Sequence, residues 1–131
     1  MRQMSFMLTT RQFRRREKHV TRRKGWLNVK VGEHIMGVVK GQGLKAGEHP
    51  VKLGEIVVTG VRREGLVGIF GPGELALEGF PDMNVAEFID MYCKANGGDA
   101  DQLCTRIAFD YVGRDAQDRS PAMTPPAPAK E

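Results

Sequence analysis

Residues 14–25, "RRREKHVTRRKG", are the most unusual stretch of this 131-residue chain. The stretch holds seven basic side chains and one acid, Glu17. Like charges repel at close spacing, so a helix this basic needs anions or buried carboxylates near it. Three interpretations follow: a solvated surface, an electrostatic grip on nucleic acid, or the rim of a reactive pocket.

The charge of the chain is concentrated at its start. Residues 1–30 hold ten Lys and Arg and one acid, a balance of +9, which leaves ten basic residues (20 − 10) and fifteen acids (16 − 1) for residues 31–131. This uneven distribution of charge along the chain predicts a face of the protein that attracts anions. A protein that neutralises phosphates gains affinity because counterions are released. Arginine is well suited to this, because its guanidinium can donate two hydrogen bonds to one phosphate. The candidate nucleic-acid-binding residues are therefore Arg14, Arg15, Arg16, Arg22, Arg23, Lys24 and Trp26. Trp26 is either a stacking platform for a base or a core aromatic.

Composition narrows the class of protein. The length suits one domain, and no apolar run approaches the roughly 20 residues that span a bilayer. The first ten residues do not resemble a signal peptide, so we expect a cytoplasmic protein with no membrane partner. Cys93 and Cys104 are interpreted as buried thiols. Because no Cys-x-x-Cys or His-x-x-x-His spacing occurs, we predict no metal site and no cofactor.

Local patterns predict an α+β order of elements. We expect a first strand at residues 5–10, and a short helix at residues 9–19 that Thr9 or Thr10 caps. The other expected elements are strands at 34–40, 51–66 and 104–112, a glycine-rich loop at 41–50, and a helix at 84–98. The last helix has the capping-box pair Asn84 and Glu87. Short, curved strands favour a small β-barrel, and residues 113–131, rich in Pro and Ala, favour a disordered tail.

The order of residues inside the basic stretch is more specific than its charge. Lys18, Thr21 and Arg23 have the spacing of the Gly-x-Lys-x-x-(Glu/Thr)-x-Arg signature of ASCH domains. "VKVGEHI", "EGFPDMNVAEFIDMYC" and "TRIAFDYV" are similar to later segments of that family, so residues 1–112 resemble one ASCH domain. The signature glycine falls on Arg16, which implies either a different backbone conformation or a continued helix.

This resemblance implies a small PUA-like β-barrel with flanking helices and a cleft at its mouth. It also implies a protein that binds RNA, or a nucleotide or nucleoside, in that cleft. Some small bacterial members resemble this chain and are amidohydrolases that deacetylate N4-acetylcytidine. Their lysine, threonine and glutamate match Lys18, Thr21 and Glu78.

The chemistry of that trio leaves alternatives open. A threonine hydroxyl is a poor nucleophile and needs a base nearby. A lysine can act as that base only when it is neutral, so its pKa must be lowered. Positive neighbours lower that pKa, whereas Glu78 opposes the shift. Alternatively, Lys18 and Glu78 form only an ion pair, and Thr21 bonds to backbone. A third possibility is a partner-binding protein of a mobile element, acting through its Pro-rich tail.

Overall fold

The computed structural model of the protein describes residues 1–40, 46, 47, 49–68 and 72–113. The tail that the sequence predicts lies outside the described residues from position 114 onward. Most of the predicted glycine-rich loop, at 41–45 and 48, lies outside them as well. No helix in the described part of the chain is long and apolar enough to cross a membrane.

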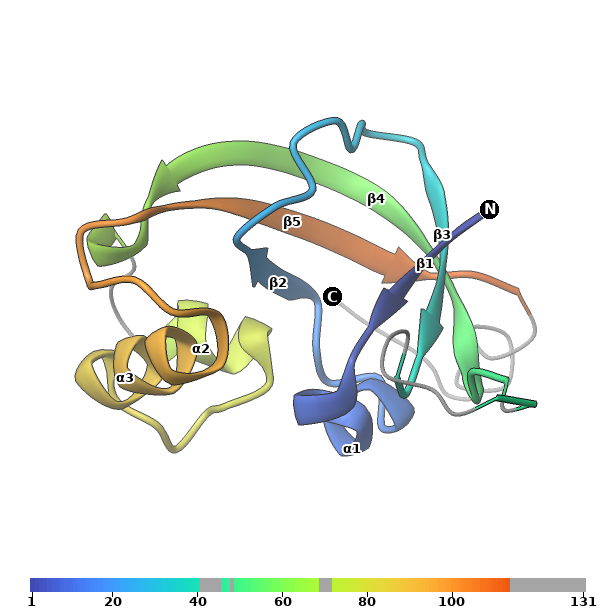
Figure 1. Cartoon of the computed structure of the whole chain (residues 1–131), viewed down its shortest axis with the longest axis horizontal. Helices are drawn as coiled ribbons and strands as arrows, with labels where there is room; N and C mark the ends of the chain where they lie inside the picture. Colours follow the sequence, from blue (N-terminus) through green and yellow to red (C-terminus); the bar gives the residue numbers. More distant parts are fainter. Residues whose placement is uncertain (41–45, 48, 69–71, 114–131) are drawn as a thin grey trace.

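The centre of the fold is a mixed sheet of five strands, β1 Arg2–Ser5, β2 Val20–Arg23, β3 His34–Val38, β4 Lys52–Gly65 and β5 Leu103–Tyr111. The strand order is β1-β3-β4-β5-β2, with β1 parallel to β3 and the other pairs antiparallel. Figure 1 shows β4 and β5 arching over the helices as a half-barrel. Because β1 and β2 are the two edge strands, the predicted barrel is open between them.

The helices are α1 Thr10–Arg14, α2 Pro72–Glu78 and α3 Val85–Asn96, with short 3-10 helices η1 Met7–Thr9 and η2 Leu66–Gly68. The capping box of α3 is confirmed. The Asn84 side chain accepts from the Glu87 amide at 2.8 Å, and the Glu87 carboxylate accepts from the Asn84 amide at 2.9 Å. These two bonds satisfy donors that the first turn of a helix leaves open.

Two predictions about the start of the chain are wrong. The first strand is not residues 5–10 but ends at Ser5, because the chain turns there and the Thr9 amide donates to the Phe6 carbonyl. The following helix ends at Arg14 instead of His19. Neither threonine caps it: the Thr10 hydroxyl donates to the Phe6 carbonyl at 2.9 Å. Beyond the helix, the His19 amide donates to the Leu77 carbonyl, which ties this segment to α2.

Two apolar clusters support the sheet. The first, around Phe6, Phe13 and Phe109, fills the concave side of the sheet near α1. The second, around Leu75, Phe88 and Tyr92, lies between the other end of the sheet and helices α2 and α3. The predicted α+β class is confirmed, and the buried polar side chains of Lys18, Thr21, Arg22 and Glu78 lie between the two clusters.

Candidate functional site

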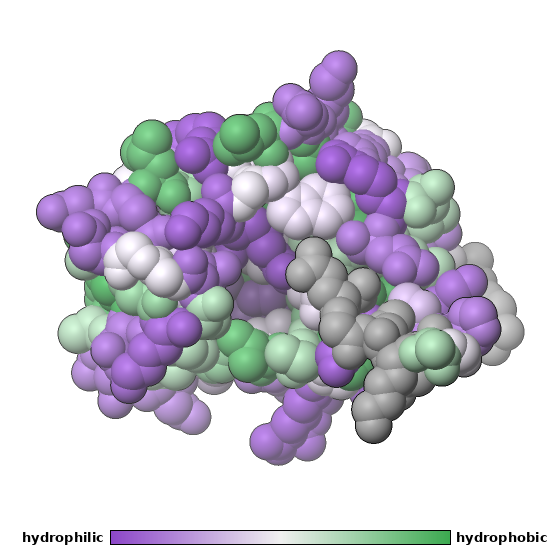
Figure 2. All heavy atoms as spheres, viewed as in Figure 1, coloured by the Kyte–Doolittle hydropathy of each residue, from purple (hydrophilic) through white to green (hydrophobic). Residues whose placement is uncertain are grey.

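A hollow of about 400 Å³ opens between the two apolar clusters. One wall comes from the end of β1 and from η1, the floor from β2, and the opposite wall from the end of α2 and one face of α3. Figure 2 shows this face of the molecule hollowed, with hydrophilic residues deep in the recess. The volume is in the range of sites for small molecules.

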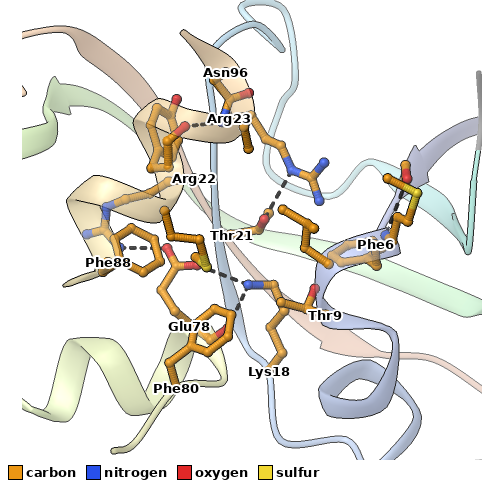
Figure 3. Close-up of a pocket in the computed structure, with 16 residues that line it drawn as sticks. Phe6, Thr9, Lys18, Thr21, Arg22, Arg23, Glu78, Phe80, Phe88 and Asn96 are labelled. Carbon is orange, nitrogen blue, oxygen red and sulfur yellow. Dashed lines mark hydrogen bonds and ion pairs between the residues drawn. The ribbon is translucent and has the colours of Figure 1, made fainter. Parts of the chain in front are cut away.

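Lys18 and Glu78 meet inside this hollow (Figure 3), and each is only 2% exposed. The Lys18 amine donates to the Glu78 carboxylate at 3.0 Å and to its backbone carbonyl at 2.7 Å. Gly79 permits this approach. Its φ is +99°, and a Cβ there would lie 2.9 Å from Gln12 Cγ and 3.6 Å from Lys18 Cβ. The sequence therefore brings the acid to the lysine through a position that favours glycine.

Arg22 forms ion pairs with three glutamates inside the protein. Its guanidinium donates to Glu78 at 2.8 Å, to Glu74 at 2.6 Å and to Glu64 at 3.0 Å, and its side chain is 1% exposed. Arg106 also donates to Glu74, at 2.6 Å. Buried charge is tolerated only when paired in this way, so Arg22 fixes the carboxylate of Glu78 on the side opposite to Lys18.

Thr21 and Arg23 point to the other side of β2, since side chains alternate along a strand. The Thr21 hydroxyl accepts from Arg23 Nε at 3.1 Å, and the Arg23 guanidinium lies over the Phe6 ring at 4.9 Å. Within the described part of the chain, no side chain or carbonyl accepts from the two terminal nitrogens of Arg23. Both residues line the hollow, so these nitrogens are available to a ligand there.

Burial changes the acid–base properties of the site. Desolvation lowers the pKa of the Lys18 amine, although the Glu78 charge opposes the shift. Of the two opposing effects, burial therefore outweighs the charge of Glu78, and the neutral form of the Lys18 amine is more favoured than in water. Burial also lowers the pKa of Arg23 to about 10 and raises the pKa of Tyr92 to about 12.

The structure divides the predicted site residues into two groups. Lys18, Thr21, Arg22, Arg23 and Glu78 all line the hollow.

The other five predicted residues lie elsewhere. Arg14 and Arg15 are exposed at the end of α1. Arg16 stacks on Tyr111 at 4.8 Å. Lys24 is exposed and donates to the Asn96 carbonyl at 3.0 Å, which puts it at the rim. Trp26 lines an adjoining hollow.

Sequence reasoning missed the aromatic part of the site. Phe6, Phe80, Phe88 and Tyr92 line the hollow with Asn96. The helical spacing of Phe88, Tyr92 and Asn96 indicates one face of α3, but it does not indicate that this face borders a cavity rather than solid core.

No metal is suggested by the described residues. Among them, no group of three or more His, Cys, Asp or Glu side chains is placed to hold a metal ion. Cys93 and Cys104 are free thiols, the second fully buried.

The fold is similar to that of known protein structures. No protein-family model and no curated protein sequence matches the chain. The open half-barrel with flanking helices is nevertheless an α+β, PUA-like fold, and within that class the chain has the fold of an ASCH domain. A crystal structure of an ASCH domain from Lactobacillus crispatus is similar with a TM-score of 0.54 and 19% identity, over 79% of this chain and 70% of that one.

A second crystal structure, of protein EF3133 from Enterococcus faecalis, carries the family label DUF984. It is similar with a TM-score of 0.57 and 14% identity, over 80% of this chain and 70% of that one.

The structure also explains the arginine at the signature glycine position. Arg16 has φ +61°, a left-handed conformation that glycine adopts readily and other residues rarely do. The helix does not continue, and the backbone keeps a glycine-type conformation under a different side chain. The Arg16 guanidinium points away into contacts with Tyr111 and the Phe13 carbonyl.

Proposed function

We propose that this protein binds a nucleoside unit of RNA in the hollow between α3 and η1. The observation that carries the proposal is the pairing of unsatisfied Arg23 donors with aromatic walls in one cavity of about 400 Å³. Planar bases are bound by stacking on aromatic rings and by hydrogen bonds to their edges. Arg23 supplies the edge contact, and Phe80, which is only partly buried, supplies an apolar face.

The surrounding charge supports an anionic ligand. Among the cations at the hollow, Arg22 is paired with three carboxylates and Lys18 with one, which leaves Arg23 without a carboxylate partner in the described chain. Lys24 adds a positive charge at the rim. A ligand that carries phosphate beside its base gains from both.

This function is tested by fluorescence anisotropy with a labelled single-stranded RNA, and by calorimetry with free nucleosides. Arg23→Ala is expected to weaken binding about tenfold or more, the scale of a lost charged hydrogen bond. Arg14→Ala, an exposed arginine outside the hollow, is the matched control and is expected to change affinity far less. Wild-type protein that retains neither RNA nor nucleoside would contradict the proposal, as would equal losses in the two variants.

A second candidate function, hydrolysis of an N4-acylated cytidine, is favoured by the lowered pKa of the buried Lys18 amine, which lines the same hollow as Thr21. In this mechanism the Thr21 oxygen bonds to the acyl carbon while its proton passes to the Lys18 amine. The carbon–nitrogen bond then breaks, and the same proton moves to the exocyclic nitrogen of the leaving cytidine. Water hydrolyses the acyl-threonine and releases the acid. Negative charge develops on the acyl oxygen during the attack, and the terminal nitrogens of Arg23, which have no acceptor in the described chain, stabilise it.

Purified protein incubated with N4-acetylcytidine tests this candidate, with cytidine and acetate as the measured products. Thr21→Val is expected to abolish turnover and keep nucleoside binding, because valine preserves the shape of threonine. Ser5→Ala removes a different hydroxyl from the same hollow and is expected to retain turnover. Lys18→Ala and Glu78→Ala are also expected to be inactive. No product from wild-type protein would remove this candidate while leaving the binding proposal standing.

A further inference from the structure

A second hollow, of about 490 Å³, adjoins the first. Three residues, Ser5, Met7 and Arg23, line both, so the two hollows lie next to each other, and we call them together the groove. The groove follows the opening between edge strands β1 and β2, where the half-barrel is not closed. Beyond Arg23 its lining includes Trp26 and Lys40.

The second hollow has the charge expected for an anion. Its charged lining residues are Arg23 and Lys40, and no Asp or Glu is among the described residues that line it. The terminal nitrogens of Arg23 lie where the two hollows join and have no acceptor in the described chain. A phosphate at this junction would receive charge-assisted hydrogen bonds from Arg23 and attraction from Lys40.

The Trp26 ring packs against a cation, Arg2, that is itself held by an acid. The φ of Trp26 is +57°, a left-handed conformation that is costly for a residue with a Cβ. The Arg2 guanidinium lies 4.5 Å from the ring centroid, and Glu33 holds Arg2 through hydrogen bonds of 2.7 and 2.9 Å. Within the described chain no group accepts from the indole N–H, so it is open to a ligand. Strain of this kind persists where the surrounding structure enforces it, often at binding sites.

From these contacts we infer a second subsite in this hollow, which binds the phosphate and sugar of the nucleotide next to the one in the first hollow. The inference rests on the proposed function. It specifies the class of ligand: a nucleotide within a strand, with a phosphate at Arg23 and Lys40, and not a free nucleoside. Trp26 contacts the neighbouring sugar through its exposed edge and N–H.

The test compares cytidine, its 3′- and 5′-monophosphates and a short oligocytidylate, by calorimetry at several salt concentrations. Oligocytidylate and one of the monophosphates are expected to bind at least tenfold more tightly than cytidine. Lys40→Ala is expected to remove most of that gain, to reduce the salt slope of oligocytidylate binding by about one, and to leave cytidine affinity unchanged. Lys30→Ala, an exposed lysine that lines neither hollow, is the matched control and is expected to match wild type.

Trp26 is the only tryptophan of the chain, so its fluorescence reports on this subsite alone. Oligocytidylate is expected to change that fluorescence, and cytidine is expected to leave it nearly unchanged. Because Trp26 packs partly on the core, this readout avoids a substitution that would disturb the fold.

The outcomes separate the two levels of the proposal. Equal affinity for cytidine and oligocytidylate, with no change in Trp26 fluorescence, would overturn the second subsite and leave nucleoside binding standing. No binding of either would overturn both. Oligoglutamate that binds as tightly as oligocytidylate, with the same dependence on Lys40, would assign the groove to acidic peptides and overturn the inference.

Discussion

The Lys18 amine lies 3.0 Å from a carboxylate oxygen of Glu78, although sixty positions of sequence separate the two residues. Arg22 lies 2.8 Å from the other carboxylate oxygen. One buried acid therefore joins the basic N-terminal segment to the end of α2. It also fixes the lysine at the floor of the cavity that we propose binds RNA.

Glu78→Gln is expected to lower the free energy of unfolding by about 3 kcal/mol or more, because it leaves two buried cations without their shared counter-charge. Urea denaturation measures the change. Glu17→Gln is the matched control, since the Glu17 side chain is 54% exposed and its ion pair with Arg15 spans 4.0 Å. An exposed pair of this kind contributes little, so the control is expected to stay within about 0.5 kcal/mol of wild type. Equal denaturation midpoints for the two variants would show that the network is not stabilising.

The lowered pKa of Lys18 gives a pH dependence of defined sign. Between its lowered value and 10.5, the folded protein binds fewer protons at Lys18 than the unfolded chain does. Stability contributed by this residue therefore rises with pH across that interval. Lys18→Met lacks this term, so wild type is expected to gain stability relative to the variant as the pH increases. Urea unfolding of both proteins between about pH 7 and 10 measures the difference.

Other groups that titrate in this interval are common to both proteins and cancel in that comparison. A stability difference between the two proteins that stays constant with pH would mean that folding does not lower the pKa of Lys18.

Local patterns in the sequence predicted the parts of the fold that depend on near neighbours. The capping box of Asn84 and Glu87 lies within one turn, so three residues of sequence contain the whole interaction. The first strand was predicted several positions too far along the chain, because its register with β3, in which Ser5 lies opposite Val38, is set by a distant strand. The Phe6 amide donates to the Val38 carbonyl, and no pattern near Phe6 indicates that partner.

The candidate trio came from resemblance, and the network around it could not be predicted from local patterns. In the sheet, Arg106 faces Arg22 on one side and Arg62 on the other, an arrangement of like charges that repels. Glu64 and Glu74 offset it by accepting from these arginines. The need for those two acids follows from strand register, and register is set by the whole sheet.

Arg16 allows the cost of its backbone conformation to be measured. Arg16→Ala and Arg16→Gly both remove the side-chain contacts with Tyr111 and the Phe13 carbonyl, but only glycine relieves the left-handed φ of +61°. The glycine variant is expected to be as stable as the alanine variant or up to about 1 kcal/mol more stable. The same pair of substitutions at Arg14, an exposed helical position, is expected to show glycine about 0.5–1 kcal/mol less stable. The same order at both positions would contradict the idea that Arg16 replaces a glycine under strain.

Glu74 is expected to control part of the acid unfolding of the protein. The hydrogen bond from Arg106 is the main cause that lowers its pKa, to about 2 from 4.5, and Arg22 adds to the effect against the opposing cost of burial. The carboxylate therefore contributes stability above about pH 4.5, and this contribution is lost as the pH falls toward 2. A shift of this size corresponds to about 3 kcal/mol. Urea unfolding from pH 6 down to 3 is expected to show a shallower loss for Glu74→Gln than for wild type or for Glu17→Gln, and parallel curves for all three would contradict the assignment of the low pKa to Glu74.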